Sequence, residues 1–321
     1  MVRRVVIPLV AVLMSASGCG LFSGGHPPDQ QPLERTTLRV GVGNVIDTAP
    51  LRLAIAEGRF KQAGLQIELV EQGQQNEGLA KLASGQLDIA FASNVAMFRA
   101  SAGGAALQLQ GEAYTSGSNT MALVTLPDSK YTEPAAKKAP SIAVNMLDDL
   151  GTLAARSTLA TAGIDASKIK FSLRPFDQMP KSLKDADVDA AWMVEPFITK
   201  AEKELGARIL ADGARGATLE IPVSSYASSA MFAQANPRTL ALFRKVLGQA
   251  QQHAADPAVV RAALPRLSDI DATTASLISL GTYPISLNGI RLQRVADLMH
   301  SSDALAGRFD VQSILPKADA P

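Results

Sequence analysis

Polar and aromatic side chains follow the carboxyl ends of several predicted strands, and their types suit the binding of a small organic molecule. In an open α/β sheet, ligands bind beyond the carboxyl ends of the strands, where helix N-termini converge. This rule selects Asn44, Asp47, Thr48, Gln72, Ser93, Asn94, Asn145, Phe176, Trp192 and Glu195. Tyr114 and Tyr226 join these candidates because they lie near the points where the chain is expected to cross between two lobes.

The sequence contains no arrangement of residues that predicts catalysis or a metal site. His26 lies in a polar N-terminal stretch, and His253 and His300 lie on or beside predicted C-terminal helices, away from the candidate loops. Cys19 is the only cysteine, so no Cys/His metal spacing exists. The segment Gly41–Gly43 lacks the following glycine of a dinucleotide-binding fingerprint. We therefore expect no enzyme activity, no catalytic or metal-ligating residue and no cofactor.

Each candidate also has a simpler structural interpretation. Side chains that precede helices can cap free backbone N–H groups, and this applies to Asp47, Thr48, Ser93, Asp148 and Asp149. Trp192 and Phe197 can belong to the core, since large aromatic side chains are usually well buried. Trp192 is still the best single candidate because it stands at a strand end, and we expect Trp192→Ala to weaken solute binding with little change in melting.

The charge of the candidate loops indicates the kind of solute. Their ionisable side chains are acidic, and the nearest basic residue is Arg174. A site for a sulfonate usually carries Arg or Lys, and unpaired carboxylates repel an anion. The loops therefore favour a neutral or cationic molecule with a flat or apolar part, such as a pyrimidine-like nutrient. Helix N-termini alone can hold an anion, so an aliphatic sulfonate is the alternative.

Alternating and helical hydrophobic patterns predict an α/β fold. Short strands with period-two alternation alternate with helices, which is typical of mainly parallel sheets with helices on their faces. The stretch 51–63 reads as one helix, with Pro50 at its start and Gly64 after its end. From Asn236 onward the chain is predicted to be nearly all helix.

The order of these elements predicts two lobes, the second inserted into the first. We expect residues 38–125 to form the first part of lobe 1 and residues 126–222 to form lobe 2. Residues 223–321 return to lobe 1 as a strand and C-terminal helices. In such a hinged arrangement, the cleft between the lobes is the expected ligand site.

The N-terminus has the features of an export signal. Arg3 and Arg4 precede the apolar run 5–14, and small residues lead to Cys19. This pattern resembles the bacterial lipoprotein signal, in which the cysteine is acylated and becomes the first mature residue. Residues 1–18 are then the signal peptide, 19–37 a flexible tether, and Cys19 the anchor at the extracytoplasmic face of a membrane. A plain secretory signal is the alternative.

Four segments together resemble a family of solute-binding proteins: 49–65, 82–91, 188–197 and 291–299. They look like the binding proteins of sulfonate, taurine, nitrate and thiamine-pyrimidine-precursor importers. The resemblance covers about residues 38–315 and implies a type II periplasmic binding protein fold. Such a protein has two lobes, each a mainly parallel sheet flanked by helices, with the ligand cleft between them.

The resemblance implies a monomer that delivers a small-molecule solute to the permease of an ABC importer by closure of its lobes. A ligand sensor for a signalling partner is a second class of function. A pyrimidine synthase of the same fold is a third, but the histidines and the cysteine are in the wrong places for it. With a net charge of +1 and no long run of like charges, nothing indicates binding to nucleic acid.

Overall fold

The computed structural model describes residues 32–73 and 75–317, so the expected signal peptide, Cys19 and most of the tether lie outside the described residues. The strands are β1 (Thr37–Val42), β2 (Gln66–Glu71), β3 (Ala90–Ser93), β4 (Leu107–Thr115), β5 (Met121–Thr125), β6 (Ser141–Val144), β7 (Lys170–Leu173), β8 (Ala190–Val194), β9 (Arg208–Asp212) and β10 (Pro222–Ser229). The helices are α1 (Ala49–Ala56), α2 (Arg59–Gln62), α3 (Gln75–Ala83), α4 (Asn94–Ala102), α5 (Leu150–Thr161), α6 (Met179–Lys184), α7 (Phe197–Leu205), α8 (Ala230–Ala235), α9 (Pro237–His253), α10 (Pro257–Leu267), α11 (Ala272–Leu277) and α12 (Gly289–Ser301).

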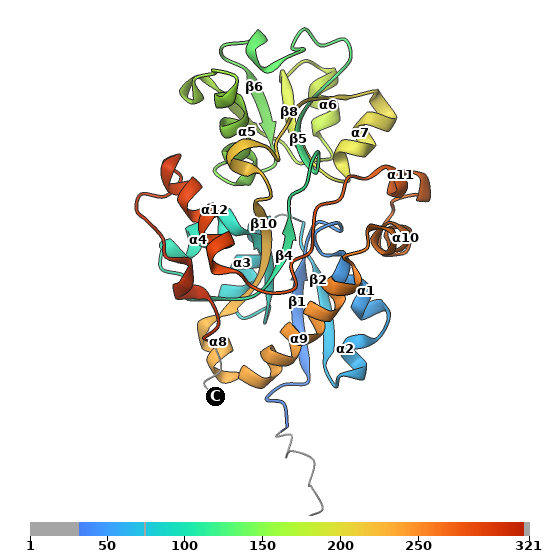
Figure 1. Ribbon diagram of the computed structural model, residues 1–321, viewed down its shortest axis with the longest axis vertical. Coiled ribbons are helices and arrows are strands. Elements are labelled where there is room, and N and C mark those ends of the chain that lie inside the picture. The colour runs from blue at the N-terminus through green and yellow to red at the C-terminus, as the bar shows by residue number, and fades with distance from the viewer. Residues whose placement is uncertain (1–31, 74, 318–321) are drawn as a thin grey trace, which may run out of the picture. The chain divides into compact units, whose positions relative to one another are not determined.

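The described residues from Leu33 onward form one compact unit that contains two α/β lobes (Figure 1). In the first lobe, β1 pairs with β2 in parallel and an isolated parallel bridge joins Val40 to Ile89, just before β3. β3 then pairs with β10, and β10 with β4. The second lobe has one sheet in the order β7-β6-β8-β5-β9. Both lobes thus have the same strand order. Three strands come first (β2-β1-β3 and β7-β6-β8), then the strand that enters from the other lobe (β10 and β5), and then the strand at the end of the order (β4 and β9).

Each lobe combines parallel with antiparallel strand pairs. β6 runs parallel to β7 and β8, but β5 is antiparallel to both β8 and β9, and β10 is antiparallel to β3 and β4. The antiparallel strands are those next to the crossings, because a chain that enters from the other lobe runs against its neighbours. By its pairing, β5 belongs to the second sheet, although the expected lobe boundary after residue 125 placed it in the first.

Two local features differ from the expected elements for identifiable reasons. The predicted helix 51–63 is divided into α1 and α2 at Gly58, which has φ of 73°. A left-handed residue cannot continue a right-handed helix, and glycine adopts this conformation without steric cost. The C-terminal region is not continuous helix, because Thr282 forms a bridge to Thr115 between α11 and α12.

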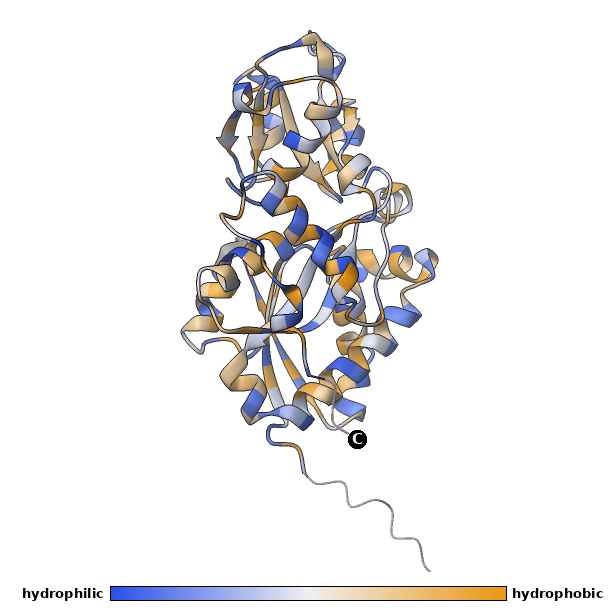
Figure 2. Cartoon of the chain, turned by 60° about the vertical axis from the view of Figure 1, so that its left-hand side comes forward, coloured by the Kyte–Doolittle hydropathy of each residue, from blue (hydrophilic) through white to orange (hydrophobic). Residues whose placement is uncertain are grey.

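Buried apolar side chains hold each sheet to its helices. Phe60 and Phe243 stack between α2 and α9 in the core of the first lobe, with ring centroids 5.7 Å apart. Hydrophilic residues lie along the outer faces of many helices (Figure 2). Among the described residues, no helix combines the length and apolar character needed to cross a bilayer.

One buried ion pair fixes the start of the first sheet. The carboxylate of Asp88 accepts hydrogen bonds from the backbone N–H and the guanidinium of Arg39, at 2.8 Å, and from Arg35. Burial alone would raise the pKa of Asp88, but the hydrogen bonds and charge of Arg39 outweigh it and hold the pKa below the usual value. Asp88 therefore stabilises the fold as an anion.

Candidate functional site

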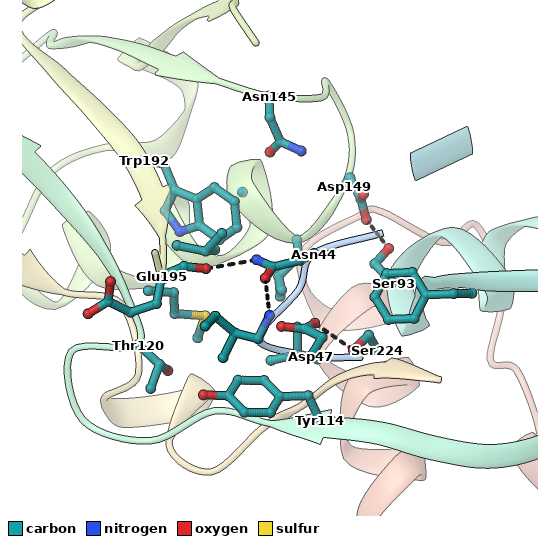
Figure 3. A pocket seen from close by; sticks show the side chains of 17 residues that line it. Asn44, Asp47, Ser93, Tyr114, Thr120, Asn145, Asp149, Trp192, Glu195 and Ser224 are labelled. Atoms are coloured by element: carbon teal, nitrogen blue, oxygen red, sulfur yellow. Dashed lines mark hydrogen bonds between the residues drawn. The ribbon is translucent and has the colours of Figure 1, made fainter. Parts of the chain in front are cut away.

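A pocket lies between the two sheets and takes residues from both lobes (Figure 3). Its cavity volume is ≈ 30 Å³. A single water molecule needs about 10–15 Å³ by the same measure, so the lobes are close together here. The lining residues are Asn44, Ile46, Asp47, Phe91, Ser93, Tyr114, Thr120, Met121, Asn145, Asp149, Leu150, Gly151, Trp192, Val194, Glu195, Val223 and Ser224.

Asn44 joins the loop after β1 to the second lobe. Its side-chain N–H donates to the backbone oxygen of Glu195 at 2.8 Å, while its amide oxygen accepts from the backbone N–H of Ile46 at 2.8 Å. The side chain therefore shapes its own loop and also bridges the pocket. Both interactions are visible as dashed lines in Figure 3.

Asp47 is a buried acid on the floor of the pocket. Its carboxyl group accepts a hydrogen bond of 2.7 Å from the hydroxyl of Ser224 on β10. Burial raises the pKa of Asp47 to about 7, although the hydrogen bond from Ser224 acts in the opposite direction. Near neutral pH, a small change in its surroundings will therefore decide whether this side chain carries a charge.

Asp149 is a second buried acid, on the opposite side of the pocket. It precedes α5 but makes no side-chain capping hydrogen bond, and it accepts instead from the hydroxyl of Ser93, at 2.5 Å. This bond crosses between the lobes. Burial raises the pKa of Asp149, against the effects of Ser93 and of the charge on Arg99. Ser93 also caps α4 by accepting from the N–H of Ala96.

Trp192 forms the aromatic wall of the second lobe. Its indole packs against Gly151 at the start of α5, where an added Cβ would lie 2.8 Å from Cε3 of the ring. Phe176 lies behind the indole, with ring centroids 6.1 Å apart, and stacks on Phe197. Trp192 is only 2 % exposed and belongs to a hydrophobic cluster. The expectation that Trp192→Ala leaves melting nearly unchanged is therefore wrong, because the change would empty a core site.

The carboxylate of Glu195 points away from the pocket, and its oxygens join two segments of the protein. They accept from the N–H and hydroxyl of Thr199 at the start of α7, and from the N–H of Ser279 at 2.9 Å. Only the backbone of Glu195 takes part in the bridge to Asn44. Burial raises the pKa of Glu195. Tyr114 lines the pocket and accepts a hydrogen bond from the N–H of Gly281.

Seven of the sequence-predicted residues lie together on the lining: Asn44, Asp47, Ser93, Tyr114, Asn145, Trp192 and Glu195. Whether each contacts a solute remains a prediction. Five others lie elsewhere: Thr48, Gln72, Asn94, Phe176 and Tyr226.

Those five side chains form hydrogen bonds or packing contacts within the fold, away from the pocket lining. Thr48 donates to the backbone oxygen of Asn44 and accepts from Arg52. Gln72 packs so closely on Gly41 and Gly78 that neither has room for a Cβ. Asn94 is fully buried at the start of α4, and Phe176 lies behind Trp192. Tyr226 pairs with Phe91 across β3 and β10, two residues deeper than the Ser224–Ser93 pair, and packs in the core.

Several lining residues escape the sequence rule. Ser224 and Val223 come from β10, Met121 begins β5 and Thr120 directly precedes it, so none follows the end of a parallel strand. These strands reach the pocket because they belong to the crossings between the lobes. These lining residues could have been predicted from where the chain crosses between the lobes, but not from the local residue pattern.

The lining carries acidic but no basic side chains. Among the described residues, Lys, Arg and His are absent from the pocket, whereas the carboxyl groups of Asp47 and Asp149 are present. The described residues also include no group of His, Cys, Asp and Glu arranged to hold a metal ion. His300 lies in the last turn of α12, where its ring contacts the backbone oxygen of Leu305, and His253 ends α9.

Two α/β lobes with a shared pocket define the periplasmic binding protein fold, and solved structures share it. The aliphatic sulphonate binding protein SsuA of Escherichia coli is 18% identical with a TM-score of 0.71, covering 89% of this chain and 94% of that one. The alkanesulfonate-binding protein SsuA of Xanthomonas axonopodis pv. citri, bound to MOPS, is 21% identical with a TM-score of 0.73, covering 89% and 100%. The nitrate-binding protein NrtA of Synechocystis PCC 6803 is 16% identical with a TM-score of 0.65, covering 76% and 70%.

A match of the sequence to a family model shows which family the chain belongs to. The model of the NMT1-like family matches residues 31–268, and the chain belongs to this family. No curated protein matches the chain. At these identities, the solved structures establish the fold alone.

Proposed function

We propose that the protein is the extracytoplasmic solute-binding component of an ABC importer. The observation that carries this proposal is the pocket between two lobes, lined from both sides, in a chain of the NMT1-like family. Solved proteins of the same fold are described as periplasmic binding proteins for sulfonates and nitrate, which supports the same class of role here. The protein would act as a monomer, and an ABC permease would be its partner.

Closure of the lobes is the proposed mechanism. Asn44 donates to the backbone of Glu195 and Ser93 donates to Asp149 across the pocket, and outside the pocket Arg99 donates to the backbone oxygen of Asp148 in the other lobe. A cavity of ≈ 30 Å³ is smaller than an organic solute, so the lobes must separate before one enters. The solute would then complete these contacts, and the permease would bind the closed form.

The lining supports a small neutral or cationic solute with a flat or apolar part. Acidic side chains and the indole of Trp192 line the pocket, whereas no basic side chain of the described residues does. One observation favours an aliphatic sulfonate instead: Gly151, in the first turn of α5, also lines the pocket, and helix N-termini bind anions.

A thermal-melt screen tests the function. The purified full chain, unfolded and refolded to remove co-purified solute, would be melted with amines, pyrimidines, taurine, aliphatic sulfonates and nitrate. A solute at a hundred times its dissociation constant adds about 2.7 kcal/mol to the free energy of unfolding, which raises the melting temperature by several degrees. Failure of the whole panel would count against solute capture.

The anchor is a separate proposal that rests on the sequence. Arg3, Arg4 and the apolar run before Cys19 support a signal peptide over residues 1–18 and acylation of Cys19. We expect Cys19→Ser to release the protein from the membrane fraction. Continued attachment of the variant would contradict the lipid anchor.

A further inference from the structure

Two buried carboxyl groups line the pocket from opposite lobes and accept hydrogen bonds from two neighbouring serines. Asp47 is 8 % exposed and accepts from Ser224, and Asp149 is 3 % exposed and accepts from Ser93. Ser224 and Ser93 are directly paired in the antiparallel strands β10 and β3. Paired residues of this kind have Cα atoms about 4.5–5.5 Å apart, so the two acids approach one spot on the sheet from two sides.

Neither acid has a cation within salt-bridge distance among the described residues, and the charge of Arg99 acts on Asp149 only from farther away. Asp47 and Asp149 form no salt bridge among them. The guanidinium of Arg99 donates to the backbone oxygen of Asp148, and Arg52 on α1 pairs with Glu71. Burying an ionised carboxyl group without a partner is costly. Each acid avoids this cost by holding a proton, and burial accordingly raises both pKa values, whereas a positive charge between the two acids would favour their ionised forms.

A third side chain that lines the same pocket has a hydrogen-bond donor without a partner. The indole N–H of Trp192 is buried and has no hydrogen-bond partner among the described residues. Buried polar groups are normally satisfied, so each exception needs an explanation. A solute with an acceptor atom would provide one, and aromatic rings of this kind also attract cations. The indole is independent of the two acids and comes from a different strand, β8.

From these observations we infer that the solute carries a positively charged nitrogen, an ammonium or amidinium group, held between the carboxyl groups of Asp47 and Asp149. The inference rests on the proposed function and deepens it by naming the chemical class of the solute. N–H groups of such a nitrogen donate to both carboxylates, and the hydroxyls of Ser93 and Ser224 keep the carboxylates in place. An anionic solute would meet two like charges instead.

The pH dependence of binding distinguishes a cation from an anion. A cation favours ionised Asp47, so affinity should fall about tenfold from pH 8 to pH 6, given a pKa of about 7. An anion bound by protonated carboxyl groups would show the opposite trend. The tyrosines that face Asp47 do not titrate over this range, because burial raises the pKa of each hydroxyl. They are Tyr114 on β4, Tyr226 on β10 and Tyr283 before α12. The guanidinium of Arg52 on α1 is the charged group on this side, and it pairs with Glu71. The acids Asp149 and Glu195 titrate in the same direction as Asp47.

Isothermal titration calorimetry of the full chain with matched probes tests the inference. The probes are benzylamine, benzamidine, benzyl alcohol and phenylmethanesulfonate, with propylamine, propan-1-ol and propane-1-sulfonate as a second set. We expect binding by amines or the amidine, stronger at pH 8 than at pH 6, with release of a proton. Binding only of an alcohol or a sulfonate overturns the cation and leaves solute capture intact. Binding by no probe counts against both.

Variants connect the result to the two acids. Asp149→Asn keeps an acceptor for Ser93 but removes the charge, and it should weaken binding of the cation by at least about 30-fold. Asp47→Asn should do the same and flatten the pH dependence, which covers the case in which Asp149→Asn fails to fold. Asp128→Asn, at an exposed position outside the pocket, is the matched control. Unchanged affinity in both pocket variants would overturn the inference.

Discussion

Replacing Asp47 with asparagine should stabilise the unliganded protein, although it alters a buried polar group. The asparagine amide keeps an oxygen that can accept from Ser224 but carries no charge at any pH. The wild-type carboxyl group must ionise in a buried site with no cation beside it, which raises its pKa from 3.8 to about 7. The substitution removes that cost.

The magnitude follows from linkage between protonation and folding. Between pH 4 and pH 7 the folded protein holds a proton on Asp47 that the unfolded chain has lost, so stability falls as pH rises. A shift of about three pKa units corresponds to about 4 kcal/mol. The advantage of Asp47→Asn should thus be small at pH 4 and grow by about 4 kcal/mol by pH 8, where it stops growing.

Asp88→Asn provides a matched control with the opposite sign. Asp88 is also buried but accepts hydrogen bonds from Arg39, and its pKa is lowered, so its contribution is present at neutral pH and is lost as pH falls through the folded-state pKa. We expect Asp88→Asn to cost about 2–3 kcal/mol at pH 8. Urea unfolding followed by circular dichroism at pH 4, 6 and 8 would measure both variants.

One result would refute the reasoning about Asp47. If Asp47→Asn lowers stability by the same amount at all three pH values, the carboxylate is part of the fold in the way that Asp88 is. The site would then hold no uncompensated charge for a solute to neutralise.

Substitutions at two positions, Trp192 and Gly151, concern the aromatic wall. Trp192→Ala should cost about 3–5 kcal/mol of stability because it empties a buried site. Trp192→Phe should cost less, but it should still weaken solute binding through loss of the indole N–H. Equal affinity of Trp192→Phe and wild type in calorimetry would exclude a solute acceptor at the indole N–H. Gly151→Ala should displace the indole and cost about 1–3 kcal/mol, although alanine favours a helix. Gly103→Ala, which has room for a Cβ at ordinary contact distances, should melt close to wild type, and similar melting of both variants would show that the indole moves freely.

The sequence alone was sufficient for the fold class because the fold depends on periodic patterns. Alternating apolar residues such as those in β1 and β2 predict strands whatever they pack against, and Gly64 and Pro50 mark helix ends by their backbone geometry. The rule that ligands bind at strand ends also located Asn44, Asp47 and Ser93, because these residues follow or end strands that run towards the other lobe.

The tertiary structure decided which side chains meet in the pocket. Tyr226 and Ser224 lie two residues apart on β10, yet only Ser224 reaches the pocket, because the register with β3 places Tyr226 against Phe91 in the core. The carboxylate of Glu195 was expected in the cleft, but Thr199 and Ser279 draw it away.

The two buried acids also needed the fold to be recognised. In the sequence, Asp149 resembles a helix cap, and only the packing of two lobes brings it to Ser93, 56 positions earlier in the chain. Local sequence patterns determine whether a segment forms a helix or a strand, whereas the environment of a charged side chain depends on residues that are distant in sequence. The sequence therefore determined the class of fold, and the contact between the lobes decided the chemistry of the pocket.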